Sequence, residues 1–156
     1  MDVKAYINKD RLTQLIYFEN EFNEININYI KKHNLIESKN LEKLIKKFIN
    51  GENVNFQNCF DLTTLPITSF QRKVYIETLK IPKGKTRTYK EIGNSINSQA
   101  YQAIGGALSK NPLPFIIPCH RVIGSNNQLT GYRGGLKLKK QLLLNEGIKF
   151  RNDKII

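Results

Sequence analysis

A cysteine and a histidine stand side by side in the segment IIPCHRVIG, residues 116–124. Adjacent side chains diverge along a strand or a helix, so a direct thiol–imidazole bond between Cys119 and His120 is awkward, whereas a bridging water can connect them. In that arrangement His120 is a general base that draws the proton from Cys119. Reactive cysteines sit in electropositive surroundings, which Arg121 would supply here. The alternative is that Cys119 is an ordinary core residue.

A base of this kind usually has a carboxylate that orients its imidazole. The acidic residues after position 64 are Glu77, Glu91, Glu146 and Asp153. Glu146 falls in the last turn of an expected final helix, where a negative charge opposes the helix dipole. This placement makes Glu146 the candidate partner of His120, and a solvated surface residue is the alternative.

The composition limits the class of protein that can carry Cys119 and His120. The chain has 156 residues, of which 40% are hydrophobic, which is enough for one ordinary domain or two small ones. No apolar run approaches the roughly 20 residues of a membrane helix, and no signal peptide is visible at the N-terminus, so we expect a cytoplasmic protein. The two cysteines, Cys59 and Cys119, have no partner spacing, which argues against a disulfide framework or a zinc site.

The charge is unevenly distributed along the chain. Residues 1–64 carry nine Lys/Arg and nine Asp/Glu, whereas residues 65–156 carry sixteen Lys/Arg and four Asp/Glu. The whole net charge of +12 therefore belongs to the second part. This asymmetry indicates a polyanionic partner for that part, with a merely soluble basic surface as the alternative.

The first part of the chain reads as strands followed by one helix. Residues 3–30 alternate β-branched and aromatic residues with Asn and Asp, which predicts strands in the stretches AYINKD, LTQLIYFE and NEININYI. Apolar residues at helical spacing predict a helix over 40–52, capped by Asn40 and ended by Gly51. Residues 52–66 read as a linker, so the first part is a small α+β domain.

The second part reads as mainly helical. We expect helices within 69–84, 88–96 and 99–112, the second starting at the capping pair Thr88 and Glu91. Two short helices joined by a tight turn in a basic region favour a helix-turn-helix. A glycine-rich loop over 124–135 precedes a final helix over 136–147. In that helix the expected inward residues are Leu136, Leu142 and Leu143, and the expected outward residues are Lys137, Lys139 and Lys140.

The run PFIIPCHRVIGSNNQLTGYRGGLKLKKQLLLNEG, residues 114–147, resembles the O6-alkylguanine-DNA alkyltransferases, also called methylated-DNA–protein-cysteine methyltransferases. Their PCHR box stands here at 118–121, and the similarity extends upstream over about residues 68–147. The resemblance implies an α+β chain. A ribonuclease H-like α/β domain would occupy 1–64 with its linker, and a winged helix-turn-helix domain that binds DNA and carries the cysteine would occupy 65–156.

The resemblance also implies the chemistry. An alkyl group passes from guanine O6, with thymine O4 as a second candidate position, to Cys119 in one irreversible displacement. The target base must be flipped out of double-stranded DNA first. The expected enzyme is a single-turnover methyltransferase that repairs DNA as a monomer, with no cofactor, no metal and no membrane partner.

Site residues follow from the same resemblance, position by position. The implied catalytic residues are Cys119 as alkyl acceptor, His120 as water-mediated base, Glu146 as its orienting carboxylate, Tyr89 as proton donor to the leaving guanine, and Asn111 as the residue that ties the active-site turn. The implied substrate-binding residues are Tyr132, Val122, Arg133 and Gly131. The implied DNA-binding residues are Gln102, Tyr101, Thr88, Ala103, Gly105, Lys110 and Arg121.

The chain departs from the family pattern at one position of functional weight. Gln102 stands where the family usually has an arginine that fills the gap left by the flipped base, so we expect Gln102, with Tyr101, to take that role at some cost in DNA affinity. Tyr75 replaces a common tryptophan, which should matter only for packing. His33 and Cys59 are too few to build the zinc site that some members carry.

Three other functions compete with alkyl transfer. A lesion-binding relative without transfer activity would lack the cysteine, which Cys119 argues against, but the missing arginine at position 102 leaves open a lesion-binding protein with weak transfer. A cysteine hydrolase is disfavoured because Cys119 and His120 are adjacent. A plain helix-turn-helix protein would prefer one DNA sequence and ignore alkylation.

Overall fold

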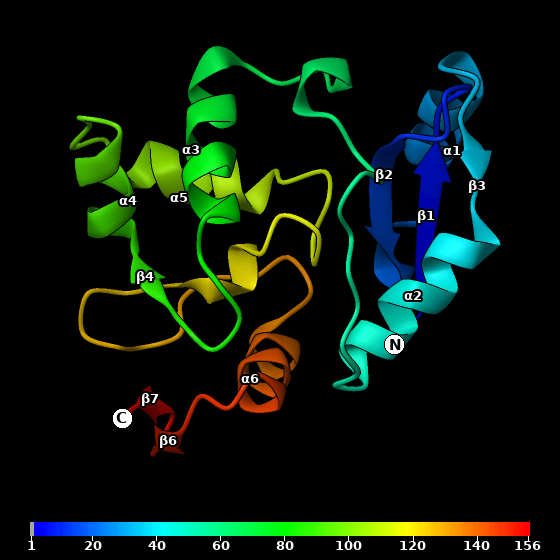
Figure 1. The fold of residues 1–156 in the computed structure, drawn as a ribbon. Helices are drawn as coiled ribbons and strands as arrows, with labels where there is room; N and C mark the ends of the chain where they lie inside the picture. Colours follow the sequence, from blue (N-terminus) through cyan, green and yellow to red (C-terminus); the bar gives the residue numbers. More distant parts are fainter. Residues whose placement is uncertain (1) are drawn as a thin grey trace. The chain divides into compact units, whose positions relative to one another are not determined.

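The computed structural model describes residues 2–156 and shows a mixed helix-and-strand chain, so the fold class is α+β (Figure 1). The chain divides into two compact units, Met1–Pro66 and Ile67–Ile156. Within the described residues, no helix combines the length and the apolarity that crossing a membrane requires.

The first unit is built on a three-stranded antiparallel sheet. Its elements are β1 (Val3–Ile7), β2 (Thr13–Phe18), the 3-10 turn η1 (Glu19–Glu21), α1 (Glu24–Lys32), β3 (Ile36–Glu37), α2 (Lys39–Ile49) and the 3-10 turn η2 (Leu62–Thr64). The strand order is β2-β1-β3, and Val3 pairs with Phe18. Helix α2 packs on β1 and buries Leu41 and Ile45, as the helical spacing of its apolar residues predicted.

The strand expected over residues 23–30 is wrong, because this stretch forms α1. The Asn23 side chain accepts a hydrogen bond from the Asn26 amide at 2.9 Å and caps the helix, and Lys31 and Lys32 complement its C-terminal dipole. These end effects outweigh the β-propensity of the isoleucines, and no residue of α1 is buried. The cap expected for α2 is also wrong: Ser38, not Asn40, accepts from the Leu41 amide at 3.2 Å.

The second unit is organised around four helices. They are α3 (Ser69–Leu79), α4 (Tyr89–Ser95), α5 (Tyr101–Ser109) and α6 (Leu136–Asn145), and the first three pack on one another. The Thr88 hydroxyl accepts from the Glu91 amide at 3.1 Å and starts α4, as its position in the sequence predicted. Asn97, with a φ of 55°, closes the tight turn to α5. Tyr75 is fully buried in α3, and its hydroxyl donates to the Ala107 carbonyl at 2.6 Å.

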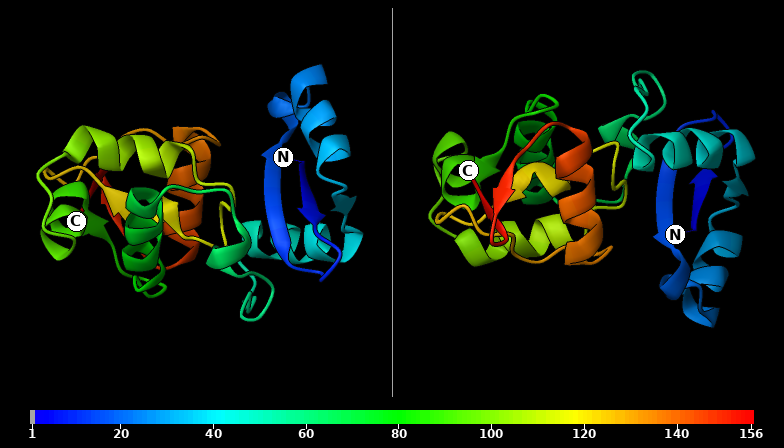
Figure 2. Two further views of the ribbon diagram at one scale, coloured as in Figure 1. Left: turned by 90° about the horizontal axis from the view of Figure 1, so that it is seen from above. Right: turned by 90° about the horizontal axis from the view of Figure 1, so that it is seen from below.

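Short strands join distant segments of the second unit. β4 (Arg87–Thr88) runs parallel to β5 (Val122–Ile123), with Arg87 paired to Val122. Because β4 leads directly into α4 and β5 follows the 3-10 turn η3 (Cys119–Arg121), this pairing brings the start of α4 beside the PCHR box. Helix α6 contacts η3 (Figure 2).

The chain ends in a hairpin that the sequence did not predict. Its strands are β6 (Phe150–Arg151) and β7 (Lys154–Ile155), drawn in red in Figure 2. Asn152 and Asp153 both have positive φ, 49° and 64°, which is the backbone of a type I′ turn.

Candidate active site

Cys119 opens into a cavity of about 420 Å³ in the second unit. The other residues that line this cavity come from α4, α5 and the loop before α6: Tyr89, Gly105, Leu108, Ser109, Thr130, Gly131, Tyr132 and Arg133. The Cys119 side chain is buried, and its η3 turn presents it at the inner wall. The cavity therefore brings the thiol of Cys119 together with two tyrosines, Tyr89 and Tyr132, and with the backbone of two glycines, Gly105 and Gly131.

Asn111 holds the chain segment that leads to Cys119. Its side-chain amide donates to the Ile117 carbonyl at 2.9 Å, and its side-chain oxygen accepts from the Leu113 amide at 2.9 Å. The Cys119 amide in turn donates to the Ile117 carbonyl at 2.7 Å. Asn111 is buried, so these bonds are shielded from water and fix the turn firmly.

His120, Arg121 and Glu146 form a buried cluster beneath the turn. His120 Nε2 lies 2.9 Å from Glu146 Oε1, and Arg121 donates from Nε to Oε2 at 2.9 Å and from Nη2 to Oε1 at 2.7 Å. Arg121 Nη1 also donates to the Ile81 carbonyl at 2.8 Å. Glu146 is the C-cap of α6, so the acid at the unfavourable helix end has cationic and imidazole partners that compensate for it.

This environment sets the charge of each member of the cluster. Burial alone would raise the pKa of Glu146, but hydrogen bonds from His120 and Arg121 and the nearby positive charge hold it at about 2. Burial lowers the pKa of His120 despite the carboxylate beside it. A neutral His120 facing an ionised carboxylate must donate its Nε2 proton to it, which leaves the basic lone pair on Nδ1.

The Cys119 thiol is held in its protonated form at rest. Burial raises its pKa, and Asn111, Lys139 and Arg133 offset part of that rise. A buried thiol of this kind needs a base at the moment of reaction, because the thiolate is the nucleophile. The neighbouring neutral imidazole can supply that base.

Lys139 is a further residue of the candidate site, and the outward position predicted for it is wrong. Its side chain is only 1% exposed, and Nζ donates to the carbonyls of Val122 at 2.6 Å, Thr130 at 2.9 Å and Gly131 at 3.4 Å. Burial lowers its pKa to about 8. The available signal was helical spacing: Lys139 lies three and seven positions before Leu142 and Glu146, on the face that α6 buries. Leu136, expected inward, is instead 48% exposed.

The two tyrosines of the cavity are held differently. The Tyr132 side chain is half-buried with its hydroxyl inside the protein, and this burial raises the pKa of the phenol well above the ordinary range. Tyr89 exchanges bonds with Thr130: its hydroxyl donates to the Thr130 carbonyl at 3.3 Å and accepts from the Thr130 hydroxyl at 3.1 Å. The Arg133 guanidinium donates to the Asn111 carbonyl and so ties the loop to the turn before Cys119.

The residues expected at DNA fall into two groups. Gln102 and Ala103 are exposed on α5, Lys110 is exposed at its C-cap, and Gly105 has no atom within 4 Å of an added Cβ. The others have internal partners. Tyr101 packs its ring against Gly93, Thr88 caps α4, and the Arg121 side chain is 12% exposed and bound to Glu146.

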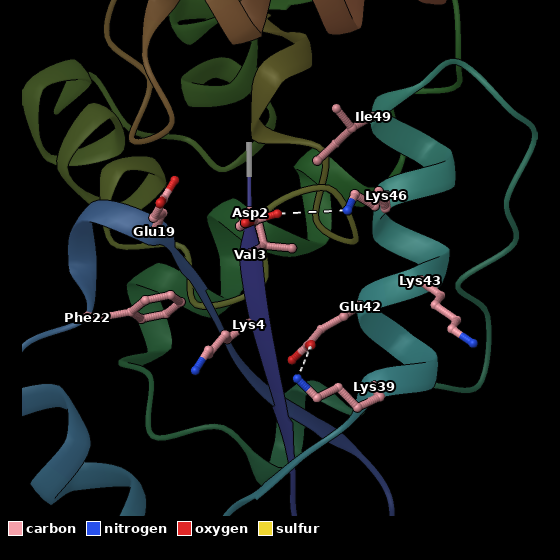
Figure 3. Close-up of a pocket in the computed structure, with 10 residues that line it drawn as sticks. All are labelled: Asp2, Val3, Lys4, Glu19, Phe22, Lys39, Glu42, Lys43, Lys46 and Ile49. Carbon is pink, nitrogen blue, oxygen red and sulfur yellow. Dashed lines mark ion pairs between the residues drawn. The ribbon is translucent and has the colours of Figure 1, made fainter.

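A second cavity, of about 470 Å³, lies in the first unit between β1 and α2 (Figure 3). Four of its charged residues form ion pairs: Lys46 lies 3.9 Å from Asp2 and Lys39 lies 3.6 Å from Glu42. None of the predicted site residues lines it. Among residues 2–156, no group of three or more His, Cys, Asp or Glu side chains is arranged to hold a metal ion.

Residues 69–148 match the family model described as 6-O-methylguanine DNA methyltransferase, DNA binding domain. The chain belongs to this family. A probable methylated-DNA–protein-cysteine methyltransferase of Acanthamoeba polyphaga mimivirus is 38% identical over 144 residues, which cover 92% of this chain and 95% of that protein. The methylated-DNA–protein-cysteine methyltransferase of Methanosarcina barkeri is 54% identical over 86 residues, and the match spans 54% of each chain, about half the length of that relative.

Solved structures of the family are similar over most of the chain. A crystal structure of Mycobacterium tuberculosis OGT in complex with DNA has a TM-score of 0.71 and 28% identity, over 92% of this chain and 85% of that one. The O6-methylguanine-DNA methyltransferase of Pyrococcus kodakaraensis has a TM-score of 0.65 and 26% identity, over 94% and 91% of the two chains. The family resemblance drawn from the PCHR box is therefore confirmed, with an α+β fold.

Proposed function

We propose that this protein repairs DNA by moving an alkyl group from O6 of guanine in duplex DNA onto Cys119. The observation that carries the proposal is the placement of the Cys119 thiol in a cavity of about 420 Å³, directly before His120, whose imidazole is paired with Glu146. The relatives named as methylated-DNA–protein-cysteine methyltransferases support it.

The reaction is one displacement, in which one bond forms, one bond breaks and two protons move. His120, acting through a water, takes the proton of the Cys119 thiol. The sulfur attacks the alkyl carbon, a new S–C bond forms, and the C–O6 bond breaks with its electron pair going to guanine. Guanine is a poor leaving group as an anion, so the Tyr89 hydroxyl gives it a proton. The thioether is stable and each protein molecule reacts once.

The cavity has the groups to hold a flipped guanine. Tyr132 forms a wall, and Gly131 in the same loop has no side chain to obstruct close approach of the base. We assign the carbonyls of Cys119 and Val122 as acceptors for the guanine amino group and the Arg133 amide as a donor to O6. The Val122 carbonyl already accepts from Lys139, but a carbonyl oxygen has a second lone pair.

DNA would meet the exposed face of α5. Helix-interior glycines destabilise a helix, and neither positive φ nor internal packing accounts for Gly105 and Gly106. We infer that their bare backbone allows the minor groove to approach closely. Gln102 and Ala103 lie on the same helix, and we assign Gln102 to the gap left by the flipped base. Lys110 and the general positive charge of this unit would contact phosphates.

Three residues expected at DNA take other roles in this proposal. Arg121 belongs to the buried Glu146 cluster, and Thr88 caps α4. Tyr101 of α5 packs its ring against Gly93 of α4. Their contribution to DNA binding is therefore through the position of the helices.

We further propose that residues 1–64 form a ribonuclease H-like domain with its linker and that residues 65–156 form a winged helix-turn-helix domain. This second domain would recognise lesions rather than a DNA sequence. A monomer without cofactor suffices for this chemistry.

The deciding experiment is intact-mass and peptide mapping after incubation with duplex DNA that carries one O6-methylguanine. We expect a stoichiometric gain of one methyl group on Cys119. The gain should be absent in Cys119→Ala and retained in the matched control Cys59→Ala. Lesion binding without any gain in mass would mean a recognition protein, and binding indifferent to the lesion would mean a plain helix-turn-helix protein.

A further inference from the structure

The loop over residues 124–135 supplies four of the nine residues that line the cavity with Cys119, namely Thr130, Gly131, Tyr132 and Arg133. It contains no helix or strand, and its internal backbone hydrogen bonds close turns, such as the bond from Gly124 N–H to the Gln128 carbonyl at 3.0 Å. A loop of this length loses conformational freedom when it is ordered. Something outside it must therefore hold it in one place.

The cavity end of the loop has a clear anchor in Lys139. Its Nζ donates to the Thr130 and Gly131 carbonyls at 2.9 and 3.4 Å. Tyr89 adds two bonds to Thr130. These contacts fix the part of the loop that faces Cys119 but leave its distal turn, residues 124–128, to be held by other groups.

The distal turn is held by the C-terminal hairpin. The Ile155 amide donates to the Asn127 carbonyl at 3.1 Å, and Gln128 forms an antiparallel bridge with Lys154. Gln128 thus pairs with β7 on the edge of that strand that does not pair with β6. Asn127 has a φ of 61°, so its carbonyl points to the hairpin because of a backbone conformation that few residues adopt.

The hairpin is itself tied to the helix that carries Lys139. Lys140 Nζ lies 2.6 Å from Asp153 Oδ1 and 5.4 Å from the centre of the Phe150 ring. Two consecutive lysines of α6 therefore hold the loop over residues 124–135 at its two ends. Lys139 binds the end at the cavity directly, and Lys140 contacts the hairpin that binds the distal turn. The Lys140–Asp153 pair is exposed and worth little by itself, so the type I′ turn and the backbone pairing are the main restraints.

We propose that the C-terminal hairpin, residues 149–156, is a positioning element that sets the active-site loop and thereby the size of alkyl group that the cavity accepts. This inference rests on the proposed function for its activity readout. The chemistry is unchanged; what the hairpin controls is the geometry of the cavity wall that the loop forms. An error of about 1 Å in such a wall can lower a rate by up to ~10²-fold.

The test compares two substitutions at one position. Asp153→Val and Asp153→Gly both remove the exposed carboxylate, but only valine is strained at a φ of 64° and breaks the turn. Maximal transfer rates are measured with duplexes that carry one O6-methylguanine or one O6-benzylguanine. We expect Asp153→Val to transfer methyl about tenfold more slowly than the parent. Its benzyl-to-methyl rate ratio should rise, since a loosened wall admits a larger group. Asp153→Gly should match the parent in both.

Two further readouts separate positioning from a general loss of structure. DNA affinity, measured in a Cys119→Ala background, should be equal in the two variants because α5 is untouched. Amide hydrogen exchange over residues 127–133 should quicken only in Asp153→Val. Equal rates and equal exchange in the two variants would overturn the inference, as would an equal loss of activity in both.

A second pair makes the test independent of the turn. Ile155→Pro deletes the N–H that bonds to Asn127, whereas Ile155→Val keeps it. Ile155→Pro should transfer methyl slowly and Ile155→Val at the parent rate. Equal rates in these two variants would overturn the inference. If the parent chain transfers no methyl group, the proposed function fails, while the exchange measurements still decide whether the hairpin holds the loop.

Discussion

His120 Nε2 lies 2.9 Å from Glu146 Oε1, although the two residues are 26 positions apart in the chain. The same carboxylate receives three hydrogen bonds from Arg121, from Nε at 2.9 and 3.2 Å and from Nη2 at 2.7 Å. Glu146 thus joins α6 to the turn that carries Cys119. Because it is ionised and His120 is neutral, the imidazole is held in one tautomer with its lone pair on Nδ1, which is the state that a general base requires.

Glu146→Gln should slow alkyl transfer by about 10²-fold, the lower end of what a positioned base contributes. The amide keeps the size of the side chain but loses the charge that fixes the tautomer of His120. The variant should also lose about 3 kcal/mol of stability, because Arg121 keeps a half-buried charge without its partner. Single-turnover kinetics and urea denaturation measure the two effects. The matched control is Glu77→Gln, which loses ion pairs with Lys80 and Arg87 but does not touch His120. Equal transfer rates in both variants would contradict the assignment.

The stability of the parent relative to Glu146→Gln should depend on pH in the acid range. Glu146 has a pKa of about 2 in the folded state against an ordinary value of 4.5, because hydrogen bonds from His120 and Arg121 outweigh burial. A depressed folded pKa contributes stability that is complete above the unfolded pKa and is lost as pH falls through the folded one. The difference between the two proteins, on the order of 3 kcal/mol, should therefore be constant above about pH 5 and shrink toward pH 2. Urea denaturation at a series of pH values measures it, and a difference independent of pH would refute the ionised pair.

The sequence was most informative where residues make local patterns. Thr88 begins α4 as expected, α2 presents Leu41 and Ile45 to the sheet, and the PCHR box led to the family. Propensity misled at residues 23–30, where isoleucines suggest a strand but Asn23 caps a helix. Asn is frequent in this part of the chain and also marks turns, so residue type alone did not single out Asn23 as a helix cap.

Long-range bonds explain the remaining differences. A lysine on an amphipathic helix is normally solvated, so the pattern placed Lys139 outward. The structure buries it because three carbonyls, from β5 and from the loop, converge at its ammonium group. In the same way, the bond from Ile155 to Asn127 depends on two turns that meet only in the folded chain. Helical spacing places Lys139 on the buried face of α6, but no spacing in the sequence records which carbonyls meet its ammonium group or that Ile155 meets Asn127.

Lys139→Met should slow alkyl transfer about tenfold, because the loop beside Cys119 loses its cationic anchor. Methionine fills the same space but leaves the carbonyls without their donor, at a cost of about 1–3 kcal/mol. The stability difference should also depend on pH. Burial lowers the pKa of Lys139 to about 8 from an ordinary 10.5, so the unfolded chain binds more protons between these values and the parent gains stability as pH rises through them. The variant lacks this gain. Lys137→Met, on the exposed side of α6, is the control and should change neither quantity.

Gly106→Ala should stabilise the protein and weaken its binding to DNA. The position is helical, and an added Cβ meets no atom within 4 Å, so alanine should gain about 0.5–1 kcal/mol. If α5 lies against the minor groove, the same methyl group would hold the backbone away from DNA and reduce the affinity. Thermal denaturation and fluorescence-anisotropy titration with duplex DNA measure the two effects. A more stable variant with unchanged affinity would mean that this face does not contact DNA.

Gln102→Arg should tighten binding to duplex DNA. Gln102 is exposed on α5, where its amide can bond to the cytosine left by a flipped guanine but adds no charge. An arginine is longer and cationic, so we expect higher affinity and a steeper decrease of affinity with salt. Anisotropy titrations at several salt concentrations, in a Cys119→Ala background, isolate binding from transfer. Gln141→Arg makes the same change on the exposed side of α6, outside the Cys119 cavity, and controls for a general electrostatic effect. Weaker or unchanged binding in Gln102→Arg, or an equal gain in both variants, would show that position 102 does not fill the gap in the duplex.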